Sequence, residues 1–385
     1  MHALLLALTL AAPPVTWQAA VTTEAVERTP EPGEASTVAT SELALAPRVG
    51  ALFGSGEAMF ALGYAPRLTL VDPQGLRQLE VLHQATVDAT FRPDRTWQLV
   101  LGELYARGNT NLTPLQRPAT AAAVPADQLP GVSSLDYMGS TTRADLKGQL
   151  SRRLELVITP SFSISGGATP SARLELPLER TPRLDTSMSW KIAGAQSLGV
   201  AAAAWHTDTS SGPTADVVEA SGTWRRQLDE RSKLSLAAGA GAYHTSEPGS
   251  ANLPWLAGPL GLFEYRRGLG ERAENLEALA QVSLGPAVDP LTGTAVERVD
   301  GIGGVEFTAM QNLRLAERAS SGVTLDGTQE GYAQLESTAT WTISKPVRLA
   351  ASARGAYLTS EAPGQASGLQ WLASVSVTVV EAGVP

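Results

Sequence analysis

Residues 184–192 read Leu-Asp-Thr-Ser-Met-Ser-Trp-Lys-Ile. Every second position is occupied by Leu184, Thr186, Met188, Trp190 and Ile192, and the residues between these positions are Asp, Ser or Lys. Successive side chains of a β-strand point to opposite faces, so this period of two predicts a strand with one apolar and one polar face. A helix would repeat its apolar residues every three or four positions instead.

The same alternation recurs along the chain, and no long segment shows a clear helical period. We therefore expect an all-β protein. Besides 184–192, the clearest alternating stretches are 79–91, 142–151, 154–164, 334–343 and 370–379.

The connections between these stretches are of two kinds, short and long. Short turns at one end and long loops at the other are typical of an outer-membrane barrel, and we predict a closed antiparallel transmembrane β-barrel of about 18 strands, with 16 as the lower limit. The pattern leaves one strand more or fewer open between residues 183 and 215. The short connections are 92–95, 151–153, 179–182, 228–231 and 344–346, and the long ones are 109–134, 166–171, 208–214, 245–255, 286–294, 325–331 and 359–368.

A large secreted β-protein is the alternative, because a soluble sandwich also alternates. Two observations favour the membrane. Many apolar-face positions carry small residues such as Ala202, Ala204, Ala238 and Ala240, which fill a packed core poorly but suit a lipid-facing surface. Aromatic residues also gather at strand ends, where they predict two interfacial girdles: Tyr105, Trp205, Tyr243, Tyr357 and Trp371 beside long loops, and Trp97, Trp224 and Trp341 near short turns.

The amino terminus predicts export. Residues 3–12 form an apolar run that suits a signal peptide and is too short to cross a bilayer. We assign 1–20 to a signal peptide cleaved near residue 19 or 20, 21–40 to a flexible periplasmic linker, and 41–381 to the barrel. The expected location is the outer membrane of a Gram-negative bacterium.

Composition excludes several classes of function. The 385 residues carry a formal charge of −9, which argues against a nucleic-acid partner. The chain has no cysteine, and its four histidines show no pair at ligand spacing, so we expect no metal site and no cofactor. No nucleophile motif or Ser/His/Asp set stands out, and we do not expect an enzyme.

The polar face of the strands predicts a water-filled lumen. A Lys or Arg that faces lipid would cost about 2–4 kcal/mol at the bilayer midplane, so the interior is the consistent place for charge. Both signs are mixed, which predicts a conduit without strong charge selectivity. The candidate lumen residues are Glu80, Asp88, Arg143, Asp145, Lys147, Glu155, Arg173, Glu175, Asp185, Lys191, Arg225, Glu306, Glu336 and Arg354.

The stretch Leu82–Leu115, with its Phe91-Arg92-Pro93 and Gly108-Asn109 segments, resembles β-barrel outer-membrane proteins of the myxobacterial type. Among these are roughly 18-stranded barrels that export polysaccharide together with a periplasmic export protein. The resemblance implies a passive polysaccharide conduit with that partner. A general or solute-selective porin, and a structural or adhesion barrel with a blocked lumen, remain alternatives.

Two further partners follow from a barrel in the outer membrane, namely the lipid around it and the barrel-insertion machinery. The chain ends Val379-Val-Glu-Ala-Gly-Val-Pro385, without the terminal aromatic residue that such barrels usually carry. We therefore expect an internal or variant insertion signal.

The longest stretch without strand pattern, 109–134, contains four prolines and predicts a constriction in or over the lumen. Deleting residues 112–130 should then raise the single-channel conductance in planar bilayers. An unchanged conductance would exclude this role.

Overall fold

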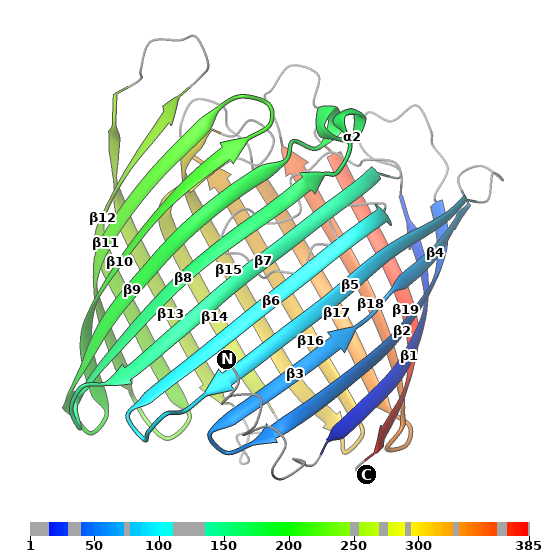
Figure 1. Cartoon of the computed structure of the whole chain (residues 1–385), viewed down its shortest axis with the longest axis horizontal. Coiled ribbons are helices and arrows are strands. Elements are labelled where there is room, and N and C mark those ends of the chain that lie inside the picture. Colours follow the sequence, from blue (N-terminus) through cyan, green and yellow to red (C-terminus); the bar gives the residue numbers. More distant parts are fainter. Residues whose placement is uncertain are drawn as a thin grey trace, which may run out of the picture.

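A computed structural model of the chain shows a barrel of tilted strands (Figure 1). The structure describes residues 15–29, 40–72, 78–110, 135–246, 254–268, 276–288, 294–325, 331–359 and 368–383.

The described residues form nineteen antiparallel strands and one short helix, α2. Apart from β3 and β4, each strand pairs with its neighbours in the chain, and β1 pairs with both β2 and β19, so the sheet closes on itself. No helix in the described ranges is long and apolar enough to cross a bilayer. The elements are β1 Thr16–Arg28, β2 Thr40–Ser55, β3 Ala58–Tyr64, β4 Arg67–Asp72, β5 Gln78–Phe91, β6 Trp97–Thr110, β7 Leu135–Gln149, β8 Leu154–Gly167, α2 Pro170–Glu175, β9 Glu179–Ala193, β10 Gln196–Thr209, β11 Thr214–Gln227, β12 Ser232–Ser246, β13 Leu256–Gly268, β14 Leu276–Val288, β15 Ala295–Met310, β16 Leu313–Thr324, β17 Gly331–Thr342, β18 Val347–Thr359 and β19 Gly368–Gly383.

Strands β3 and β4 share one position in the ring, because both pair with β2 on one side and with β5 on the other. The ring therefore has 18 positions, and the predicted closed barrel is confirmed. The pairing register explains why the strand at this position is interrupted between β3 and β4. Val49 pairs with Tyr64 and Leu45 with Leu68, so Pro47 would lie opposite Pro66, and neither proline has an N–H to donate to the ladder.

Residues 16–28 depart from the sequence analysis, which places them at the end of the signal peptide and in the linker. They form β1, whose thirteen residues pair with β2 along their whole length. The assignment of 21–28 to a flexible linker is therefore wrong. Without β1, the facing edges of β2 and β19 would lose their hydrogen-bond partner, which a lipid-embedded sheet does not tolerate.

The strand count between residues 183 and 215 was uncertain because one turn was predicted at the wrong place. Residues 179–182, expected to be a short connection, begin β9. The short turn lies instead at residues 194–195, between β9 and β10. Pro182 misled the prediction, because proline at a strand start resembles a turn residue.

Aspartates stabilise two of the short turns. The Asp94 carboxylate accepts hydrogen bonds from the Thr96 hydroxyl and amide and from the Trp97 amide, and the first of these contributes most to lowering the pKa of Asp94. The Asp229 carboxylate accepts from the Arg231 amide and the Ser232 hydroxyl, and its pKa is lowered chiefly by the Arg231 bond. These turns are local Asx structures that need no tertiary support.

The register assigns every strand residue to one of two faces, because cross-strand partners share a face. One face carries large apolar side chains that are more than half exposed, such as Leu43, Val200 and Val375. This is the outer, lipid-facing surface. The other face lines the lumen.

The ladder opens a second time between β13 and β14. These strands pair only from Gly261–Leu284 to Gly268–Glu277, although β12 stays paired with β13 up to Leu256. Continuing the register would place Pro259 opposite Pro286. A proline facing a proline again leaves the rung without a donor, and the strands separate.

Beyond this opening, the end of the β14–β15 hairpin lies inside the upper part of β11–β13. Val288 and Ala295, which share the outer face of their hairpin, pack against Val217 and Tyr243, which belong to the inner face of β11–β12. The amide of Ala295 also donates to the Thr245 hydroxyl at 2.9 Å. The hairpin end therefore narrows the lumen.

The inward hairpin can be tested with cysteines, since the chain has none of its own. A Cβ at Gly241 would lie 3.0 Å from Cγ of Pro286, so the double variant Gly241→Cys/Pro286→Cys should form a disulfide. The matched variant Pro259→Cys/Pro286→Cys should not, because its sites lie across the open seam. An intramolecular disulfide changes the mobility of the protein on a non-reducing gel, and reduction abolishes the change. The same gel assay is applied to both variants. Cross-linking of the second pair alone would contradict the inward position.

Candidate functional site

The lumen wall is the candidate functional site, and the register places most of the predicted lumen residues on it. Twelve of the fourteen lie on the inner face of a strand. They are Glu80, Asp88, Arg143, Asp145, Lys147, Glu155, Asp185, Lys191, Arg225, Glu306, Glu336 and Arg354.

Arg173 and Glu175 belong to α2 and not to a strand, so strand alternation does not assign them to a face. The Arg173 guanidinium donates to the carbonyls of Gly167 and Ala168 at 3.2 and 3.4 Å. It therefore secures the connection between β8 and β9 at the long-loop end. Thr169 caps the helix, and Pro170 opens it, a pairing that starts a helix and ends the preceding strand.

Six of the eight predicted interface aromatics lie on the outer face: Trp97, Tyr105, Trp224, Trp341, Tyr357 and Trp371. Trp205 and Tyr243 are corrections. Both pair with Val217 of the inner face, so both face the lumen. The run Ala201–Ala204 precedes Trp205, and four small residues in succession erase the period-two signal that would have assigned its face.

Two rows of polar side chains cross the inner wall of β7–β11. Register aligns Arg143, Ser161 and Arg183 in the upper row, which ends at Trp205. The Arg183 guanidinium lies 4.4 Å from the centre of the Trp205 ring. Such a cation–π contact holds the guanidinium against the wall.

The lower row contains two aspartates, each two residues after its arginine on the same strand, and Thr159 of β8 lies between them. Asp145 accepts from Arg143 Nε at 3.0 Å and from the Thr159 hydroxyl at 2.7 Å. Asp185 accepts from Arg183 through both of its oxygens, at distances of 2.7–3.0 Å. Each aspartate is thus paired with the arginine two positions before it on the same strand.

The same Arg-x-Asp arrangement occurs at three places on the inner face. In the sequence these are Arg143-Ala-Asp145, Arg183-Leu-Asp185 and Arg298-Val-Asp300, and the third pair also joins Nε to Oδ1, at 2.8 Å. Residues i and i+2 of a strand share a face, so the spacing alone predicts a pair. Sequence reasoning named Arg143, Asp145 and Asp185 as separate charges, and it missed Arg183 and the repeated motif.

A recess of about 190 Å³ opens on this wall beside the lower row. Its polar lining includes Arg183, Asp185, Glu219 and Thr159, and Ala201 and Ala203 leave the space that larger side chains would fill. The carboxylate of Glu219 lies 3.7 Å from a Cβ placed on Gly285, so the inward β14–β15 hairpin borders the recess.

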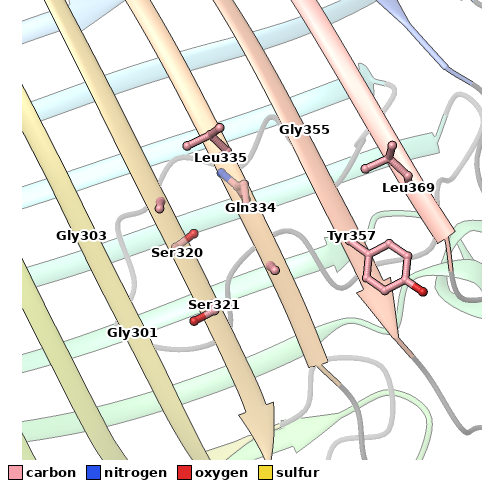
Figure 2. A pocket seen from close by; sticks show the side chains of 11 residues that line it. Gly301, Gly303, Ser320, Ser321, Gln334, Leu335, Gly355, Tyr357 and Leu369 are labelled. Atoms are coloured by element: carbon pink, nitrogen blue, oxygen red, sulfur yellow. The ribbon is translucent and has the colours of Figure 1, made fainter.

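A larger hollow, of about 530 Å³, lies on the opposite surface of the sheet (Figure 2). Gly301, Gly303 and Gly355 form part of its floor, and Tyr357 and Leu369 lie at its edge. These residues belong to the outer face, where glycine leaves the backbone uncovered. The lumen recess, though smaller, is the one that carries charged groups.

The sequence matches the EpsX exopolysaccharide export family over residues 7–385. The chain belongs to this family. No curated protein matches the sequence.

Solved porins share the fold. The chain is similar to OccAB2 of Acinetobacter baumannii, with a TM-score of 0.51, 11% identity, and 96% of this chain and 98% of that chain covered. OccAB4 of the same organism has a TM-score of 0.50 and 10% identity, with 97% of this chain and 99% of that chain covered. OccK9 (OpdG) of Pseudomonas aeruginosa has a TM-score of 0.50 and 14% identity, with 95% of this chain and 98% of that chain covered.

An export family and a porin-type fold are both non-enzymatic kinds of protein. Within the ranges that the structure describes, no three His, Asp or Glu side chains come together in a group that could hold a metal ion. The loop predicted to constrict the lumen, 109–134, falls almost entirely outside the described residues, which resume at Leu135.

Proposed function

We propose that the barrel is a passive conduit through which an exopolysaccharide crosses the outer membrane. Membership of the export family supports this function, and the outer-membrane location agrees with the barrel and its porin-type neighbours. The observation that carries the proposal is the inner wall, where ion pairs and hydroxyls face a closed ring.

The chemistry of this wall suits a sliding sugar chain. Its aspartates and arginines neutralise each other within a strand, so the wall offers many hydrogen-bonding atoms with little net field. A polysaccharide can exchange bonds to water for bonds to such a wall at a small net free-energy change, about 0.5–1.5 kcal/mol per hydrogen bond. Strong single-site binding would slow its passage.

Export machinery supplies the polymer from the periplasmic side. Membership of the family indicates such partners in general. We place the contact with a periplasmic export protein at the short-turn end of the barrel, because outer-membrane barrels keep their short turns in the periplasm. Outer-membrane lipid covers the outer face, and the barrel-insertion machinery places the protein there.

A solute-selective porin is the second candidate, and the Occ fold favours it. Both functions use an open lumen, so conductance alone does not separate them. The two functions differ in the size of the molecule whose transport in the cell requires the protein: a polysaccharide for the conduit, a small solute for the porin.

Deletion of the gene should abolish one surface polysaccharide and leave the uptake of small sugars unchanged. Assays are polysaccharide immunoblotting or dye binding on whole cells, and liposome swelling with purified protein and small sugars. Complementation with the intact gene is the control. Normal surface polysaccharide together with slower solute uptake would favour the porin instead.

The amino terminus gives a separate prediction. Cleavage near residue 19 or 20 would remove the first residues of β1 and their pairs with β2 and β19, from Trp17–Gly383 onward. We propose that the mature chain keeps all of β1 and begins before Thr16. Amino-terminal sequencing of protein purified from outer membranes checks this. A mature terminus within residues 17–28 would contradict it.

A further inference from the structure

Two Arg-x-Asp pairs stand side by side on the lumen wall, one on β7 and one on β9. The strand between them, β8, contributes Ser161 to the upper row and Thr159 to the lower. Neighbouring strands lie about 4.8 Å apart, so the two pairs are separated by roughly 10 Å. This array is about as long as two sugar rings.

The array is held in place before any ligand arrives. The Asp145 carboxylate is fixed by Arg143 and by the Thr159 hydroxyl, and the Asp185 carboxylate is fixed by two bonds from Arg183. Trp205 restrains the Arg183 guanidinium from the other side. Groups positioned in this way lose little conformational entropy when they bind.

Glu219 differs from the aspartates. Its carboxylate is partly buried beside the recess, near Arg183 and Asp185, and no described residue is seen to donate a hydrogen bond to it. The neighbouring hairpin offers Gly285 and Pro286 there, and neither has a polar side chain. An acceptor in this position suits a ligand that brings its own hydroxyl donors.

We propose that this part of the wall is a binding station for one or two units of the transported polysaccharide, and we call it the β7–β11 station. Thr159, Arg183, Asp185 and Glu219 line the 190 Å³ recess. The station also includes the neighbouring pair Arg143 and Asp145, which the Thr159 hydroxyl joins to the recess through its bond to Asp145. The proposal rests on the proposed conduit function and adds where the sugar pauses.

Charge and shape define the class of sugar. Two guanidiniums and three carboxylates leave one formal negative charge, which disfavours uronic acids. Carboxylates accept from the hydroxyls of a pyranose ring, and Ala201 and Ala203 provide a small apolar surface for its C–H groups. The station therefore takes neutral or amino sugars.

The test uses the purified full-length protein in planar bilayers, with maltohexaose and hexagalacturonate as probes. The double variant Arg183→Gln/Asp185→Asn removes one pair without changing the net charge. Maltohexaose should block the wild-type current, and its binding constant should fall about tenfold in the variant, the effect of losing one or two hydrogen bonds to charged groups. Hexagalacturonate should block the wild type more weakly than maltohexaose.

The matched control is Arg180→Gln/Asp208→Asn, a charge-neutral change at an ion pair of cross-strand partners on the outer face of β9–β10. Maltohexaose block should be unchanged in it, and heat-modifiable gel migration should show that both variants fold. An equal loss of block in both variants, a variant that binds like the wild type, or no block of the wild type would each overturn the station. The conduit function is judged separately, by the surface polysaccharide of the deletion strain, so it can stand when the station fails.

Discussion

Hydrocarbon offers no hydrogen-bond partner to a backbone N–H or C=O, and this constraint determines the structure. A sheet in lipid must close, because each unpaired group costs several kcal/mol. Closure here depends on β1, which joins β2 to β19 over twelve or more rungs on each side. Residues 16–28 are therefore part of the wall, although their composition resembles a linker.

Proline decides where the closed ladder opens. Single prolines are accommodated: Pro160 pairs with Leu184, Pro182 with Phe162, and the β8–β9 ladder continues through both. Both openings occur where the register would bring two prolines together, at Pro47–Pro66 and at Pro259–Pro286. The first opening is bridged by the neighbouring strands β2 and β5. At the second, the hairpin end turns inward, and its apolar outer face exchanges lipid for the inner wall of β11–β12.

The sequence predicts the fold class, the closed ring and most lumen residues because one period governs them all. A period-two signal fixes the face of a residue only while large and small, or apolar and polar, residues alternate. It fails after Ala201–Ala204, where Trp205 was assigned to the wrong face. It also fails for Arg173, which follows a helix cap that the pattern does not reveal, and for residue 182, where a proline inside a strand imitates a turn. The inward hairpin depends on a register between strands, which no single strand encodes.

The outer face shows that alternation does not send every charge to the lumen. Glu103 and Glu317 lie on the lipid-facing side, and hydroxyls of the adjacent strand donate to each: Ser140 and Thr142 to Glu103, and Ser337 to Glu317. The lumen pairs carboxylates with guanidiniums, whereas these two outer carboxylates are satisfied by neutral donors. Water in the lumen solvates the exposed part of an ion pair, so a charged wall is stable there. On the lipid side that solvent is missing, and a carboxyl group is better satisfied by compact donors from the neighbouring rung, which bring no second charge out of water. These two glutamates thus show a kind of polar pairing that needs no water, whereas the polar atoms of the inner wall remain available to a passing sugar.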